Sequence, residues 1–128
     1  MAEFGFPKTS RLLNAADYKA VFSNAQFKVS CRQFLVLAIP NSRPRPRLGL
    51  VIAKKNVALA VQRNRIKRQL RDTFRHSATL LESLDLVVLA RKDADKLDNK
   101  QLKTTIDNLW QDLHGKIQRA AAKSQGNR

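Results

Sequence analysis

Residues 57–76 carry apolar and basic side chains in two separate stripes at helical spacing. The apolar stripe consists of Leu59, Ile66, Leu70 and Phe74, and the polar stripe consists of Asn64, Lys67, Arg68, Arg71 and Arg75. At about 100° per residue, each stripe falls on its own side of a helix. The segment therefore predicts an amphipathic helix that packs through one side and presents cations on the other.

The positive charge of the chain is concentrated around this segment. Lys and Arg number 25 against 10 Asp and Glu, which gives a net charge of +15. Between residues 41 and 75, eleven basic residues are opposed by one acid, Asp72, and contribute +10 of that total. A single basic face is most often merely solvated. Here, like charges at i,i+4 such as Lys67 and Arg71 repel each other. The high density of positive charge therefore favours an anionic partner that relieves this repulsion: nucleic acid, a membrane surface or an acidic protein.

Length and composition narrow these alternatives. A chain of 128 residues suits one domain, and we expect an ordered core over about residues 10–118 with a frayed basic tail at 119–128. The apolar run at residues 84–90 is far shorter than the roughly 20 residues of a spanning helix, and the N-terminus resembles no secretory signal. We therefore expect a cytoplasmic protein with no membrane partner. Cys31, the single cysteine, can form no internal disulfide and is expected to be a small apolar strand residue.

The remaining periodicities predict an α+β domain. Asn14 and Asp17 resemble a helix start, which predicts a short helix to about Ser23. Alternation from residue 27 and an apolar run to residue 39 predict strand, the proline-rich stretch 40–47 predicts a mobile basic loop, and residues 48–53 and 84–90 predict further strands. Asp98 with Gln101 predicts the start of a last helix with an apolar face.

No set of residues in the sequence supports catalysis by the protein itself. His76 and His114 lie far apart without metal-ligand spacing, and the four glycines are isolated, so neither a metal site nor a phosphate loop is predicted. Tyr18 and Phe22 stand one helical turn apart. Their spacing alone favours core packing over a platform on which bases stack, and Cys31, Phe34 and Trp110 are likewise expected in the core.

The segment G-L-V-I-A-K-K-N-V-A-L-A-V-Q-R-N-R-I-K-R at residues 49–68 resembles the signature of the bacterial ribonuclease P protein component, with R-N-R at Arg63–Arg65. The similarity extends to R-L-L-N-A-A-D-Y-K-A-V-F at residues 11–22, R-Q-F at 32–34 and L-V-V-L-A-R-K at 86–92. It implies a single α-β-β-β-α-β-α domain with a four-stranded mixed sheet, similar to domain 2 of ribosomal protein S5, and a left-handed β-α-β crossover that general topology rules do not predict.

The resemblance also implies a function and two RNA-binding surfaces. The protein would assist a catalytic RNA subunit in removing the 5′ leader of precursor tRNA, with Mg²⁺ used by the RNA and no cofactor held by the protein. Contacts with the RNA subunit are implied for Lys54, Lys55, Arg63, Asn64, Arg65, Lys67, Arg68 and Arg71. Contacts with the leader are implied for Tyr18, Phe22, Phe34 and Leu37.

Two positions depart from the family pattern. Tyr18 replaces a residue that is commonly Phe, and Leu37 stands where relatives can have an aromatic residue, so weaker stacking on the leader is expected. The isolated protein is expected to be a monomer. The alternative functions are a ribosomal or other structural RNA-binding protein of similar fold, a nuclease that needs no RNA, and a reader of the DNA major groove.

Overall fold

The computed structural model describes residues 14–81 and 83–126 of the chain. Within them the protein forms a four-stranded sheet, three α-helices and one short 3-10 helix. The elements in chain order are α1 (Ala15–Asn24), β1 (Phe27–Ser30), β2 (Phe34–Pro40), β3 (Arg47–Val51), α2 (Ala60–His76), β4 (Leu84–Ala90), η3 (Ala94–Lys96) and α3 (Asn99–Gly126). This order confirms the predicted α+β class.

The sheet is mixed, with strand order β1-β2-β4-β3. β2 pairs antiparallel with both β1 and β4, whereas β3 pairs parallel with β4. Because parallel neighbours need a crossover connection, α2 links these two strands from one side of the sheet. The predicted left-handedness of this crossover stays a prediction.

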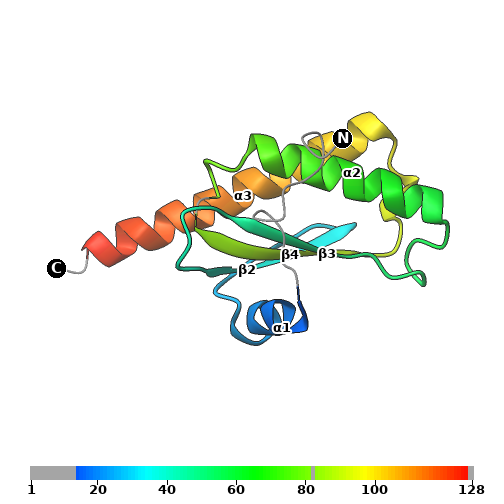
Figure 1. Ribbon diagram of the computed structural model, residues 1–128. Helices are drawn as coiled ribbons and strands as arrows, with labels where there is room; N and C mark the ends of the chain where they lie inside the picture. The colour runs from blue at the N-terminus through cyan, green and yellow to red at the C-terminus, as the bar shows by residue number, and fades with distance from the viewer. Residues whose placement is uncertain (1–13, 82, 127–128) are drawn as a thin grey trace.

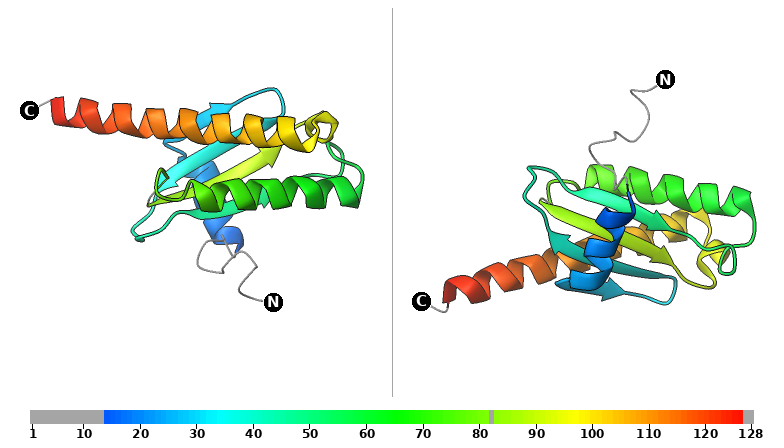
Figure 2. Two further views of the ribbon diagram at one scale, coloured as in Figure 1. Left: turned by 90° about the horizontal axis from the view of Figure 1, so that it is seen from above. Right: turned by 60° about the horizontal axis from the view of Figure 1, so that its bottom comes forward.

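The helices form two layers on the sheet. α2 and α3 lie side by side over one face, and α1 crosses the other (Figures 1 and 2). Strand residues alternate between these faces: Val36 and Val88 belong to the large core under α2 and α3, while Leu37 and Val87 belong to a smaller cluster under α1. The α1 face of the sheet is therefore only partly covered by helix.

The large core centres on Trp110 of α3, as the sequence predicts. Its ring is fully buried and meets Phe74 of α2 edge to face, with ring centroids 5.8 Å apart. The indole Nε1 donates a hydrogen bond to Thr73 Oγ1 at 3.0 Å, so the only polar atom of the ring is satisfied inside the core. This contact joins the two helices of the layer.

The predicted helix starts are confirmed by their hydrogen bonds. Asn14 Oδ1 accepts from the backbone N–H of Asp17 at 2.9 Å. Asp98 Oδ1 accepts from the N–H of Gln101, and Gln101 Oε1 accepts from the N–H of Asp98, which forms a reciprocal capping box. The core start expected near residue 10 lies outside the described residues.

The structure differs from the sequence expectation at three places. The strand expected over residues 27–39 is two antiparallel strands joined by a bend, which leaves Cys31 just after β1 and packed against the core. Leu59 is the N-cap residue of α2 and its side chain is 65% exposed, so its place in the apolar stripe is wrong; Val57 is buried instead. α3 continues to Gly126, whereas the sequence predicts fraying from residue 119.

The loop between β2 and β3, expected to be mobile from its prolines, makes hydrogen bonds within itself and to Ser83, just before β4. Asn41 accepts through Oδ1 from the N–H of Arg43 and donates through Nδ2 to the carbonyl of Arg45. Ser83 Oγ donates to the Arg43 carbonyl, and the Asn41 N–H donates to the Ser83 carbonyl. These bonds fasten the loop to the start of β4.

Candidate nucleic-acid interface

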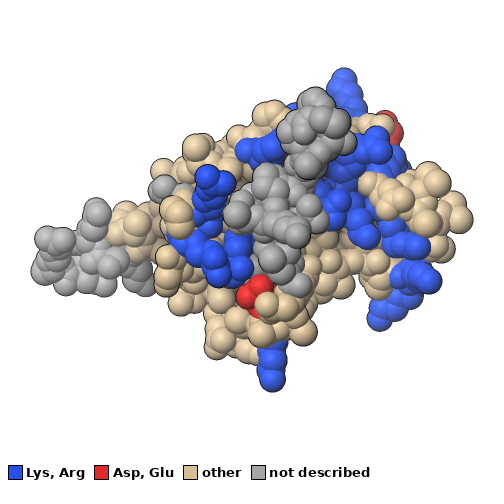
Figure 3. Space-filling view, in the orientation of Figure 1, with Lys and Arg blue, Asp and Glu red and all other residues tan. Residues whose placement is uncertain are grey.

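The polar side of α2 forms a continuous cationic surface, which we call the α2 basic stripe and define as Asn64, Lys67, Arg68 and Arg71. Ile66, Leu70 and Phe74 bury the opposite side of the same helix in the core, so packing fixes which way the stripe faces. Asn64, Arg68 and Arg71 are exposed and Lys67 is partly exposed. Figure 3 shows Lys and Arg side chains gathered over this helix.

The stripe is not neutralised by the part of the chain that the structure describes. The ion pairs there involve other cations, namely Arg32, Arg47, Arg75, Lys96 and Lys103. No described carboxylate lies within ion-pair distance of Lys67, Arg68 or Arg71. Within the described residues no acid reduces the repulsion among the cations of the stripe, so only water, salt or an external anion can reduce it.

Arg63 lies to one side of the stripe, and its side chain donates hydrogen bonds to the backbone of the segment that precedes α2. Its Nη1 donates to the carbonyls of Val57 at 3.0 Å and Ala58 at 2.7 Å. A guanidinium has five N–H donors, so Arg63 retains donors for a ligand. Arg63 therefore holds the segment that enters α2 and adds charge beside the stripe.

Arg65 lies to the other side and ties α2 to the start of α3. Its Nη2 donates to the carbonyl of Asp95 at 3.2 Å and its Nη1 donates to Asn99 Oδ1 at 3.0 Å. Its Nε donates to Gln62 Oε1. The two arginines of R-N-R thus project to opposite sides of the helix, because they are two residues apart, and Asn64 stands exposed between them.

Lys54 and Lys55 are exposed on a turn that precedes α2. The N–H groups of Asn56 and Val57 both donate to the carbonyl of Ala53 at 3.0 Å. The Asn56 side chain donates to the carbonyl of Ala90, the last residue of β4, at 3.0 Å. Asn56 therefore fixes the turn that carries the two lysines, a positioning role that the sequence analysis missed.

A second candidate surface lies between α1 and the sheet. Tyr18 packs with Leu37 and fully buried Val21 in the cluster on this face, and the Tyr18 hydroxyl accepts from the N–H of Leu50 at 3.3 Å. Phe22 is 45% exposed, although a large apolar side chain is usually buried in the protein or against a partner. Three of the four predicted leader contacts, Tyr18, Phe22 and Leu37, therefore belong to α1 or to the face that it crosses.

Phe34, the fourth, lies on the other face of the sheet. Its side chain is fully buried in the core beneath α2 and α3. Because successive strand residues point to opposite faces, Phe34 sits with Val36 and Ala38, not with Leu37. This burial confirms the core position expected from the sequence and corrects the leader contact that the family resemblance implies for Phe34.

A buried ion pair stands on the α1 face. Arg47 donates through Nε and Nη2 to both oxygens of Asp85, at 2.9 and 2.7 Å, and its Nη2 lies 3.5 Å from Asp17 of α1. Asn41 donates to Asp85 Oδ1 at 2.7 Å. Burial alone would raise the pKa of Asp85, but the hydrogen bonds from Arg47 and Asn41 outweigh it and hold that pKa below its usual value. In the sequence Arg47 is simply one of the eleven basic residues between positions 41 and 75, and no local pattern there reveals this network.

The histidines and acids form no catalytic arrangement among the described residues. His76 and His114 bond through Nδ1 to the backbone carbonyls of Asp72 and Leu80, respectively. No three His, Cys, Asp or Glu side chains gather as metal ligands in residues 14–81 and 83–126. Within those ranges no helix has the length and hydropathy to cross a bilayer. The surfaces described above can bind anions and aromatic rings.

Comparison with known proteins gives one consistent family. The family model described as Ribonuclease P matches residues 6–114. Two curated relatives, both named ribonuclease P protein component, are 44% identical to the chain: that of Chromohalobacter salexigens over 97% of both chains, and that of Marinobacter nauticus over 99% of this chain and 96% of its own.

Solved structures agree with this family. The RNase P protein of Staphylococcus aureus superposes with a TM-score of 0.75 at 28% identity, covering 81% of this chain and 94% of that one. The RNase P protein of Thermotoga maritima, in complex with a fluorophenyl thiourea, gives a TM-score of 0.70 at 28% identity, covering 78% and 96%. The matched family model, the relatives and the shared fold together show that the chain belongs to the ribonuclease P protein family.

Proposed function

We propose that the α2 basic stripe, with Lys54, Lys55, Arg63 and Arg65 beside it, binds the catalytic RNA subunit of ribonuclease P. The chain is the auxiliary protein subunit of this endoribonuclease, which acts in tRNA 5′ processing through its RNA. The observation that carries the proposal is the lack of described carboxylate partners along the stripe. When cations without acidic partners bind a polyanion, counterions of the polyanion are released, and this release favours binding.

The α1 face of the sheet is proposed to hold the 5′ leader of the precursor. Partly exposed aromatic rings stack on unpaired bases of any sequence, and Phe22 is such a ring. Tyr18 supports the same surface, because its hydroxyl bond to Leu50 keeps the ring against β3. The two RNA surfaces then lie on opposite sides of the sheet, so one protein can contact both RNAs at once.

The chemistry of hydrolysis belongs in this proposal to Mg²⁺ on the RNA subunit, with no cofactor of the protein's own. The protein neutralises phosphates and positions the leader. It acts in the cytoplasm with its RNA partners and is a monomer when isolated.

The stripe is tested by replacing Arg68 and Arg71 together with glutamine, which keeps helix propensity and removes two charges. Each phosphate neutralised contributes about 0.7 to 0.9 to the slope of log K against log salt. Loss of two contacts should lower that slope by roughly 1.5 and weaken RNA-subunit binding roughly 10- to 30-fold near physiological salt. The measurement is a titration of labelled RNA subunit at several salt concentrations.

The matched control is the double variant Lys19→Gln/Arg32→Gln, which also removes two charges. Both side chains are exposed, on α1 and on the bend after β1, outside the α2 basic stripe. The control should bind almost as the unmodified protein does. Equal slopes for the two double variants would show that net charge, not the stripe, governs binding.

A further inference from the structure

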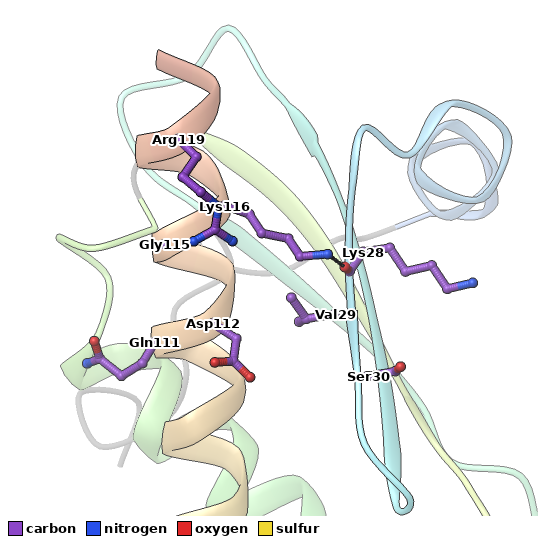
Figure 4. A pocket seen from close by; sticks show the side chains of 8 residues that line it. All are labelled: Lys28, Val29, Ser30, Gln111, Asp112, Gly115, Lys116 and Arg119. Atoms are coloured by element: carbon purple, nitrogen blue, oxygen red, sulfur yellow. Dashed lines mark hydrogen bonds between the residues drawn. The ribbon is translucent and has the colours of Figure 1, made fainter. Parts of the chain in front are cut away.

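A groove of about 530 Å³ separates the edge strand β1 from the C-terminal half of α3 (Figure 4). Its walls include the backbone of β1 around Lys28 and the side chains of Asp112, Lys116 and Arg119. It lies under the α3 layer, on the face of the sheet opposite α1. The two surfaces proposed above do not include it.

Cationic side chains outnumber acidic ones in the lining of the groove. Lys116 Nζ donates to the backbone carbonyl of Lys28 at 2.6 Å, and an ammonium has three donors, so further donors of Lys116 remain for a ligand. Arg119 lies within ion-pair distance of no described carboxylate. Asp112 is the one acid of the lining. The groove therefore has a surplus of positive charge and suits an anion.

Gly115 supplies an independent observation. It lies on the groove in the interior of the 28-residue helix α3, where glycine destabilises a helix relative to alanine. A Cβ built on Gly115 would meet only Arg119 Nη1, at 3.4 Å, beyond its own chain neighbours and helix backbone. The described packing of the protein therefore does not require glycine at this position, whereas close approach of a ligand to the helix backbone would.

We propose that this groove binds a ribose–phosphate backbone segment of the RNA subunit, with Arg119 and Lys116 holding phosphate and Gly115 admitting the strand. This rests on the proposed function. The RNA subunit is favoured over the precursor because the groove lies on the face that carries α2, away from the α1 face proposed for the leader. Gly115, Lys116 and Arg119 lie just after the last residue that the family model matches, residue 114, in a part of α3 that the alignments with the two 44%-identical relatives still cover.

The first test is the double variant Lys116→Gln/Arg119→Gln, titrated with labelled RNA subunit over a range of salt. Each lost phosphate contact reduces the salt slope by about 0.7 to 0.9, so the slope should fall by up to about 1.5 and affinity by roughly 10- to 30-fold. The variant Lys19→Gln/Arg32→Gln is again the charge-matched control. Circular dichroism of each variant checks that the fold is kept.

The second test is Gly115→Ala, for which the proposal expects opposite effects on stability and binding. Alanine should raise the melting temperature because it favours the helix, while its methyl group, which the free protein accommodates in contact with Arg119 Nη1, obstructs close approach of the RNA strand to the helix backbone. RNA-subunit affinity should therefore fall although the protein is more stable. An unchanged affinity with a raised melting temperature would overturn the role of Gly115.

The results of these tests distinguish a failure of the groove proposal from a failure of the proposed function. If the unmodified protein does not bind the RNA subunit, the proposed function fails. If it binds, and Lys116→Gln/Arg119→Gln binds as tightly as the control, the groove proposal alone fails. If the loss appears only when the preassembled holoenzyme binds precursor tRNA, the assignment to the RNA subunit is wrong.

Discussion

Arg47 and Asp85 form the one strongly buried charged pair in the described part of the chain, with side chains 11% and 8% exposed. Such a pair stabilises a fold only when its geometry is good and its other hydrogen-bonding atoms are satisfied. Here both carboxylate oxygens accept from Arg47, and Asn41 donates a further bond. The pair joins the parallel strands β3 and β4, and Asp17 extends it to α1.

Replacing Asp85 with asparagine should destabilise the protein by about 3 kcal/mol, because it leaves the buried Arg47 guanidinium without its main counterion. Urea unfolding followed by circular dichroism measures the change. Asp72→Asn is the control: Asp72 also pairs with an arginine, Arg75, but those side chains are 46% and 51% exposed. Exposed pairs contribute at most about 1 kcal/mol, so a similar loss in both variants would contradict the role given to burial.

The residue scale also shows where sequence patterns stop being informative. The apolar stripe of residues 57–76 correctly places Ile66, Leu70 and Phe74 in the core. It misplaces Leu59, because periodicity does not mark where a helix begins when its N-cap has no side-chain hydrogen bond. Phe34 is correctly expected in the core from its spacing, and it is the leader contact implied by the family resemblance that the structure corrects.

Among the elements, α1 is the most lightly attached helix. Val21 is its only buried residue, Tyr18 packs in the same small cluster as Leu37 of the sheet, and the polar ties to the sheet include the Tyr18 hydroxyl bond and the Asp17 contact with Arg47. A ten-residue helix is too short to be stable alone in water. The position of α1 is therefore set by these few contacts, and with it the width of the proposed leader surface.

Phe22→Ala tests α1 as a leader-binding element. The ring is 45% exposed, so its removal should change stability little, while loss of stacking on one base, about 1–3 kcal/mol, should weaken precursor binding by the holoenzyme at least about fivefold. Binding is compared for precursor tRNA and for mature tRNA without a leader. Equal losses for both RNAs would show that Phe22 does not act through the leader.

The elements themselves were largely predictable from the sequence. Caps at Asn14 and Asp98, the helical period of residues 57–76 and the apolar run at residues 84–90 each depend on local contacts, and each is confirmed. The bend after β1 was missed because Arg32 and Gln33 carry no strong turn signal. The ties made by Asn56 and Arg65 join residues about 30 positions apart, and no local pattern reveals such contacts.

Across the whole molecule, cations outnumber acids by 15. The ion pairs that form are mostly exposed, and the α2 basic stripe and Arg119 lack described acidic partners. Such an excess destabilises the compact state through self-repulsion. The same charges that favour RNA binding therefore oppose folding of the free protein.

Salt should consequently act in opposite directions on folding and on binding. Between about 0.01 and 0.15 M salt the screening length falls from about 30 to about 8 Å, which weakens repulsion across the protein. The melting temperature of the free protein should rise over this range while its affinity for the RNA subunit falls. Differential scanning calorimetry gives the first quantity, and a falling melting temperature would mean that attractive ion pairs outweigh the repulsion.

The Lys116 ammonium on the Lys28 carbonyl has a consequence for the free chain. β1 is an outer strand, and unpaired main-chain groups on such a strand invite another polypeptide to add to the sheet. A lysine reaching over from α3 occupies one of these acceptors and sets a charge beside the others. The Lys116 contact should therefore disfavour self-association of the free protein through β1 before it binds RNA.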